Sequence, residues 1–119
     1  MRTILCEKLG IELPIIQAAL GGATCPALAA AVSNAGGLGM LVLTGAELDA
    51  MRQEIRETRA LTSRPFGVNL NLRRPQEERV AVCLEEGVPV ISFFWCEPAR
   101  ALVAAEEARA ALRNAMKPS

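Results

Sequence analysis

The 119-residue chain contains no histidine and no tyrosine, and its aromatic residues are three phenylalanines and one tryptophan. The lack of histidine removes the most common general base and excludes mechanisms in which histidine activates a serine or cysteine. So few aromatic rings argue against a surface on which nucleic-acid bases stack. Thirteen basic and thirteen acidic residues cancel, so the charge favours neither nucleic acid nor a membrane surface as a partner.

Paired metal-binding cysteines are also missing. The four cysteines are Cys6, Cys25, Cys83 and Cys96, and none forms a Cys-x-x-Cys pair. Without histidine as a second type of ligand, this spacing predicts free thiols rather than a zinc site, and we expect no metal. Free thiols and the lack of a signal-peptide pattern at the N-terminus are typical of a cytoplasmic protein.

No charged residue lies between Glu12 and Glu47, and this length would suit a membrane span. Two prolines and six glycines interrupt the stretch, which favours short elements buried in a protein core over a membrane helix. The expected elements are a strand centred on residues 15–16, a helix over 26–35 and a strand over 38–43. Two parallel strands need such a helical crossover between them.

The remaining sequence continues this alternation. Residues 1–12 are expected to form an entry segment before the first strand. After residue 43, the expected elements are a helix over 46–61 capped by Thr44, a strand over 66–70, a helix over 76–86, a strand over 90–95 and a last helix from 97 to 116. In the helix over 46–61, the apolar spacing predicts a buried face, and its arginines are expected on a solvated outer face. The strand over 90–95 is apolar throughout, which is typical of strands buried on both faces.

Four strand–helix units in strict order predict an α/β fold with a parallel sheet, wound as a barrel or as a doubly wound layer. No Gly-x-Gly-x-x-Gly follows a predicted strand, and no P-loop motif is present. The pattern therefore favours about the first four units of a TIM barrel, with residues 1–119 as a single partial (β/α) barrel domain.

Four ordered segments carry a family resemblance. They are Pro-Ile-Ile-Gln-Ala from Pro14, Leu-Ala-Ala-Ala-Val-Ser-Asn-Ala-Gly-Gly-Leu-Gly from Leu28, Phe-Gly-Val-Asn-Leu from Phe66, and Gly-Val-Pro-Val-Ile-Ser-Phe-Phe-Trp from Gly87. The pattern resembles the nitronate monooxygenase (2-nitropropane dioxygenase) family of FMN-dependent TIM barrels. Flavin-type enoyl-acyl-carrier-protein reductases share much of it. The likeness covers the N-terminal half of the family's barrel.

The resemblance implies a flavin site at the ends of two strands. In the family, the backbone after the first strand lies against the flavin ring, which implicates Ala18, Ala19, Leu20 and Gly21. Asn69 matches an asparagine whose amide hydrogen-bonds the flavin, although a polar residue after a strand also serves as a turn former. For Gln17, an amide behind the flavin contacts and a simple end-of-strand polar residue both stay open, and we favour the second.

The resemblance further implies FMN-dependent oxidation of a small alkyl nitronate by oxygen, giving a carbonyl compound and nitrite. The family's catalytic histidine lies in a Gly-Gly-His motif that this chain lacks, so we assign no catalytic residue and expect little turnover by the chain alone. Two alternatives remain. The chain is a relative of the flavin-type enoyl reductases, or it is a non-catalytic half-barrel that forms a homo-oligomer through open sheet edges.

Overall fold

The computed structural model describes residues 2–95 and 103–107. Its elements are α1 (Ile4–Leu9), α2 (Pro26–Asn34), β1 (Gly39–Val42), α3 (Leu48–Leu61), β2 (Phe66–Asn71), α4 (Glu77–Glu85) and β3 (Val90–Phe94). The strands form one parallel sheet in the order β1-β2-β3, as the alternation predicts. Residues 103–107 are helical, and the rest of the expected last helix lies outside the described residues.

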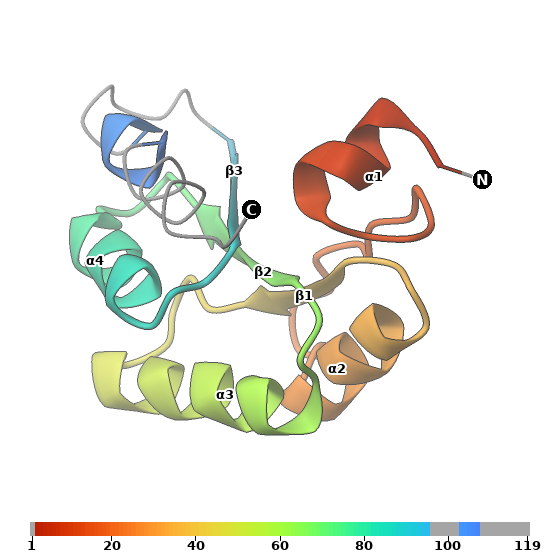
Figure 1. Cartoon of the computed structure of the whole chain (residues 1–119). Helices are drawn as coiled ribbons and strands as arrows, with labels where there is room; N and C mark the ends of the chain where they lie inside the picture. The colour runs from red at the N-terminus through yellow and green to blue at the C-terminus, as the bar shows by residue number, and fades with distance from the viewer. Residues whose placement is uncertain (1, 96–102, 108–119) are drawn as a thin grey trace.

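The helices divide between the two faces of the sheet. Helices α2, α3 and α4 lie on one face, and α1 lies on the other (Figure 1). Alternate strand residues, among them Leu41, Val68 and Ile91, form the main core with Met51 and residues of α4. The residues between them face away from these helices. The sheet therefore has one face filled by the crossover helices and one face turned toward α1.

Helix α1 was not expected within residues 1–12. Thr3 caps it by accepting a hydrogen bond from Cys6 N, and Gly10 ends it with φ 71°. A six-residue helix has little stability alone, so α1 depends on packing against the rest of the protein. Cys6 and Ile11 form a second apolar cluster with Leu38 and Met40, which closes the N-terminal end of the sheet's second face.

The expectation for the strand at residues 15–16 is only partly correct, because the segment pairs in parallel but is neither buried nor a full strand. Ile16 forms a single parallel bridge with Leu38, and Ile15 and Ile16 are 56% and 46% exposed. Pro14 has no N–H to donate, and the described residues provide no strand beyond this edge. Residues 15–16 therefore lie along the outer edge of the sheet, beside the start of β1.

The expectation for residues 90–95 is also only partly correct. Of strand β3, only Ile91 is buried, and Phe94 is 38% exposed. Strand β3 is the last strand of the described sheet, so one of its edges has no neighbouring strand. Glu106 accepts a hydrogen bond from Ile91 N at 3.1 Å, which covers part of that edge.

Two expectations for α3 need correction. Its N-cap position is Glu47, without a side-chain cap. Thr44 instead accepts a hydrogen bond from Asn71 N at 2.9 Å, which joins the ends of two strands. The outer arginines are not merely solvated, because Arg52 and Arg56 pair with Glu86 of the α4 C-terminus at 3.4 and 2.8 Å. The predicted buried face, with Met51, Ile55 and Thr58, is confirmed.

Candidate functional site

The sheet face turned away from the crossover helices carries a polar pair. Asn69 of β2 lies beside Ser92 of β3 in the register, and its Nδ2 donates to Ser92 Oγ at 2.9 Å. Asn69 is 5% exposed, and its Oδ1 has no hydrogen-bond partner among the described residues. Sequence reasoning missed Ser92, because a serine in an apolar strand gives no signal without the register.

An unpartnered buried amide oxygen is unusual, since leaving such a group unsatisfied costs about 1–3 kcal/mol. Asn69 Oδ1 is therefore suited to accept a hydrogen bond from an N–H group of a bound molecule. The hydroxyl of Ser92 can donate as well as accept, so the amide can also turn and present its NH₂ group. Either way, the pair offers one polar group to a ligand.

Gln17 has a structural role at the start of the predicted flavin loop. Its Nε2 donates to Met40 O at 3.3 Å, and its Oε1 accepts from Met40 N at 3.1 Å. The side chain thus continues the pairing that the backbone makes when Gln17 N donates to Leu38 O. This geometry agrees with the end-of-strand interpretation of Gln17.

The loop after Gln17 is exposed and consists of Ala18, Ala19, Leu20 and Gly21. The Leu20 carbonyl accepts from Ala23 N and from both N and Oγ1 of Thr24, which fixes a tight turn. Within the described part of the chain, no backbone N–H of residues 18–21 donates a hydrogen bond. Small residues and unused N–H groups suit close approach of a flat ligand.

The structure places the loop and Asn69 at the same end of the sheet. The loop follows the Ile16–Leu38 bridge, and Asn69 is the register partner of Val42 near the end of β1. No hydrogen bond joins the loop to Asn69 among the described residues. They form two separate parts of one candidate site, at the carboxyl ends of parallel strands where barrel enzymes have their active sites.

A second feature at this end was not foreseen from the sequence. The Arg73 guanidinium lies over the Trp95 ring, 3.9 Å from its centroid. Arg73 N also donates to Asn71 Oδ1 at 2.9 Å, just after β2 ends. Cys96 and Glu97, the residues after Trp95, lie outside the described residues.

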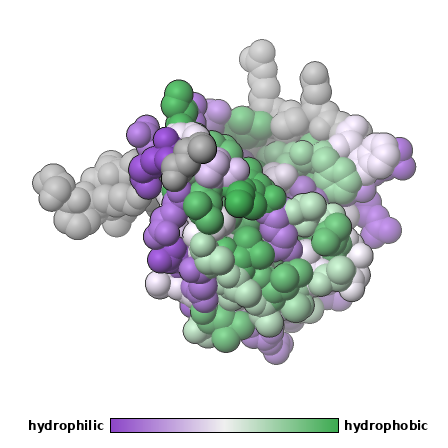
Figure 2. Space-filling view, turned by 90° about the vertical axis from the view of Figure 1, so that its right-hand side faces the viewer, coloured by the Kyte–Doolittle hydropathy of each residue, from purple (hydrophilic) through white to green (hydrophobic). Residues whose placement is uncertain are grey.

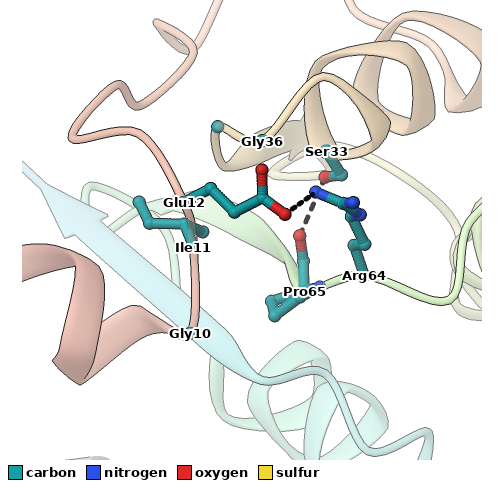
Figure 3. Close-up of a pocket in the computed structure, with 8 residues that line it drawn as sticks. Gly10, Ile11, Glu12, Ser33, Gly36, Arg64 and Pro65 are labelled. Carbon is teal, nitrogen blue, oxygen red and sulfur yellow. Dashed lines mark hydrogen bonds and ion pairs between the residues drawn. The ribbon is translucent and has the colours of Figure 1, made fainter. Parts of the chain in front are cut away.

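The opposite end of the sheet has a pocket of about 290 Å³ between α1, α2 and the start of β2 (Figure 3). Arg64 pairs with Glu12 there at 2.9 Å. Ser33 Oγ donates to Pro65 O at 2.8 Å and accepts from Gly39 N at 3.0 Å. Within the described ranges, the pocket has no buried side-chain polar atom without a partner. It therefore fits a structural role, as is usual at this end of a barrel.

The three cysteines that the structure describes have no imidazole partner that would make them nucleophiles. Burial raises the pKa of Cys83 to about 12, so this thiol stays protonated at neutral pH. Cys6 is buried in the cluster with α1, and Cys25 is exposed beside α2. With no histidine in the chain, no imidazole can activate any of them.

These features define a class of protein: a segment of a parallel α/β barrel with a polar site at its carboxyl strand ends. A model of the family described as nitronate monooxygenase matches residues 2–78. The chain belongs to the nitronate monooxygenase family. This result confirms the resemblance inferred from the four sequence segments.

Individual relatives agree with this assignment. A nitronate monooxygenase from Pseudomonas aeruginosa is 48% identical over 93 residues, which are 76% of this chain and 26% of the relative. The chain therefore spans about a quarter of that relative's length. Among the described residues, no helix has the length and apolar character needed to cross a bilayer.

Two solved structures support the TIM-barrel assignment. A FabK variant from Thermotoga maritima is similar with a TM-score of 0.86 and 39% identity, covering 92% of this chain and 37% of that chain. A nitroalkane oxidase from Streptomyces ansochromogenes is similar with a TM-score of 0.76 and 33% identity, covering 84% and 39%. The α/β fold class, as part of a barrel, is thereby confirmed.

Proposed function

We propose that this chain forms the flavin-facing part of an FMN-dependent enzyme that oxidises alkyl nitronates with molecular oxygen. The observation that carries the proposal is the buried, unpartnered Oδ1 of Asn69 at the carboxyl end of the sheet. Bound FMN would supply the redox chemistry, because it accepts an electron pair from an organic substrate and transfers electrons to oxygen. The family's reaction gives a carbonyl compound and nitrite.

The residues of this chain would bind and orient the flavin. Asn69 Oδ1 is available to accept a hydrogen bond from a ring N–H, while Ser92 holds the other end of the amide. The exposed loop over 18–21 would bring small residues and free N–H groups against the ring. Below the pair, the apolar cluster of α1 and β1 keeps water from the N-terminal side of this face.

The test of this proposal is a titration of the chain with FMN, followed by the change in flavin fluorescence. We expect saturable FMN binding by the parent chain. The dissociation constant should be about tenfold higher for Asn69→Ala, because this variant loses one good hydrogen bond to the flavin. The matched control is Gln53→Ala, which removes an exposed amide whose one hydrogen bond among the described residues goes to Glu57 on α3. No saturation by the parent chain, or equal affinities for parent and Asn69→Ala, would contradict the proposal.

Turnover requires a further group. The chain has no histidine to act as a general base, so we expect the purified chain with FMN to release little nitrite from an alkyl nitronate. A nitrite assay with free FMN as the blank measures this directly. Nitrite release well above the blank would show that the residues of this chain suffice for the chemistry.

A flavin-type enoyl reductase is the alternative for the same site. The similarity to the Thermotoga maritima FabK variant favours it as a relative. The two activities differ in electron source, because a reductase takes electrons from a reduced nicotinamide and a nitronate monooxygenase takes them from its substrate. The test is bleaching of the bound flavin in the absence of oxygen. Bleaching by NADPH would indicate a reductase, and bleaching by an alkyl nitronate would indicate a nitronate monooxygenase.

Self-association is a second candidate role. Ile15 and Ile16 are exposed beside β1, and Phe94 and Trp95 are exposed at the end of β3. Figure 2 shows apolar residues gathered over the side of the molecule that carries α1 and α2. We propose that two copies pair through these edges, because pairing would bury them. A light-scattering mass equal to one chain at micromolar concentration would contradict this role.

A further inference from the structure

Arg73 and Trp95 form a cation–π pair at the carboxyl end of the sheet. The guanidinium carbon lies 3.9 Å from the centre of the indole ring. Stacking of this kind holds the guanidinium plane while leaving its N–H groups free at the edges. Trp95 is 61% exposed, so the pair lines an open surface rather than the core.

The backbone holds both residues in place. Asn71 Oδ1 accepts from Arg73 N at 2.9 Å, and Leu72 N donates to Phe94 O at 3.1 Å, which ties the turn after β2 to the end of β3. Trp95 has φ 83° and is the one non-glycine residue with positive φ in the described ranges. Such a conformation is strained for a bulky side chain and is common where a side chain is held for binding.

The Arg73 guanidinium has no acidic partner among the described residues. Arg52, Arg56 and Arg64 each pair with a glutamate. Arg73 makes no ion pair, and its guanidinium donates no hydrogen bond, within the part of the chain that the structure describes. The stacked guanidinium therefore presents a positive charge and free donors at the end of the sheet that carries Asn69.

We propose that Arg73, stacked on Trp95, binds the nitronate group of the substrate and selects the anion over the neutral nitroalkane. This inference rests on the proposed function. A nitronate spreads its negative charge over two oxygens, and the guanidinium fork matches two such oxygens with paired N–H donors. The half-exposed Phe94 ring lies beside Trp95 with its centroid 6.1 Å away and offers an apolar surface for the alkyl groups.

Arg74 provides a matched control. It is the next residue in the chain and carries the same charge, but its Nη1 lies near Gly45, and no aromatic ring stacks on it among the described residues. A general effect of net charge should be the same for both arginines. A binding site at the stacked pair should depend on Arg73 alone.

Trp95 is the only tryptophan of the chain, so its fluorescence reports binding at this pair without a label. We would titrate the full chain, without FMN, with propyl-2-nitronate, with neutral 2-nitropropane and with inorganic phosphate. Free N-acetyltryptophanamide corrects for collisional quenching and absorption. Circular dichroism confirms that each variant is folded.

The expected result is saturable quenching by the nitronate. Its dissociation constant should rise about tenfold in Arg73→Gln, less in Arg73→Lys, and less than about twofold in Arg74→Gln. Equal nitronate affinity in the parent and Arg73→Gln would overturn the proposal. Equal affinity of the parent chain for 2-nitropropane and for the nitronate would also overturn it. Tighter binding of phosphate than of nitronate would overturn it as well and would assign the pair to a phosphate group.

These outcomes are independent of the flavin titration. Loss of FMN binding with Arg73-dependent nitronate binding would leave this inference standing and remove the proposed flavin site. FMN binding without Arg73-dependent nitronate binding would keep the flavin site and overturn this inference.

Discussion

The Cα of Gly39 lies against the carbonyl group of Ala29, so closely that no side chain fits between β1 and α2. A Cβ at Gly39 would overlap that carbonyl and lie 2.8 Å from Ser33 Oγ. Ser33 Oγ itself bonds Gly39 N and Pro65 O. The contact sets the distance between the first crossover helix and the sheet.

We therefore expect Gly39→Ala to lower the free energy of unfolding by about 1–3 kcal/mol or more, because the overlap is with backbone. Gly45→Ala is the control, since its Cβ would meet nothing closer than 3.8 Å. Urea unfolding followed by circular dichroism measures both. Equal stability of the two variants would show that α2 can move away from the sheet without cost.

Ser92 should matter for stability as well as for the site. In Ser92→Ala, the Asn69 amide loses its one described partner, and we expect a loss of about 1–3 kcal/mol. Ser63→Ala changes an exposed serine and should have little effect. If Ser92→Ala is as stable as the parent, then water already satisfies the amide, and Asn69 Oδ1 is not left open for a ligand.

The pairing of α3 with α4 predicts a dependence on pH. The hydrogen bond from Arg56, together with Arg52, holds the pKa of Glu86 below its ordinary value of 4.5. A lowered pKa stabilises the fold above that ordinary value, and the contribution is lost as the pH falls through the folded-state pKa. Stability should therefore fall on acidification below about pH 5, and less steeply in Glu86→Gln. Parallel pH profiles for the two proteins would contradict this.

Cysteine reactivity should follow burial. Burial raises the pKa of Cys83 to about 12, and Cys25 is exposed. Under native conditions at neutral pH, we expect iodoacetamide to modify Cys25 and to leave Cys83 unmodified until urea unfolds the chain. Site-resolved mass spectrometry distinguishes the two. Rapid native modification of Cys83 would mean that α4 separates readily from the sheet.

The sequence predicts the order of helices and strands well because glycine and proline mark their ends. Pro26 begins α2 and Gly87 follows α4, as expected. The burial expected for the strand at residues 15–16 is wrong, because burial depends on neighbouring elements that the local sequence pattern does not show. Helix α1 is missed because its stability comes from packing of Cys6 and Ile11.

The site could be predicted only in part. Asn69 was identified by resemblance, but its partner Ser92 depends on the register of β2 and β3. The Arg73–Trp95 stack joins residues 22 positions apart and follows from the turn that ties β2 to β3. Contacts of this kind are set by the fold and leave no local pattern.

The most direct test of the account is the NMR signal of the Asn69 side-chain amide during addition of FMN to ¹⁵N-labelled protein. We predict that this NH₂ signal shifts and saturates, because flavin binding engages the amide that Ser92 holds. The Gln53 amide signal on α3 should not move. An unchanged Asn69 signal at saturating FMN, or equal shifts of both amides, would contradict the claim that this face binds the flavin.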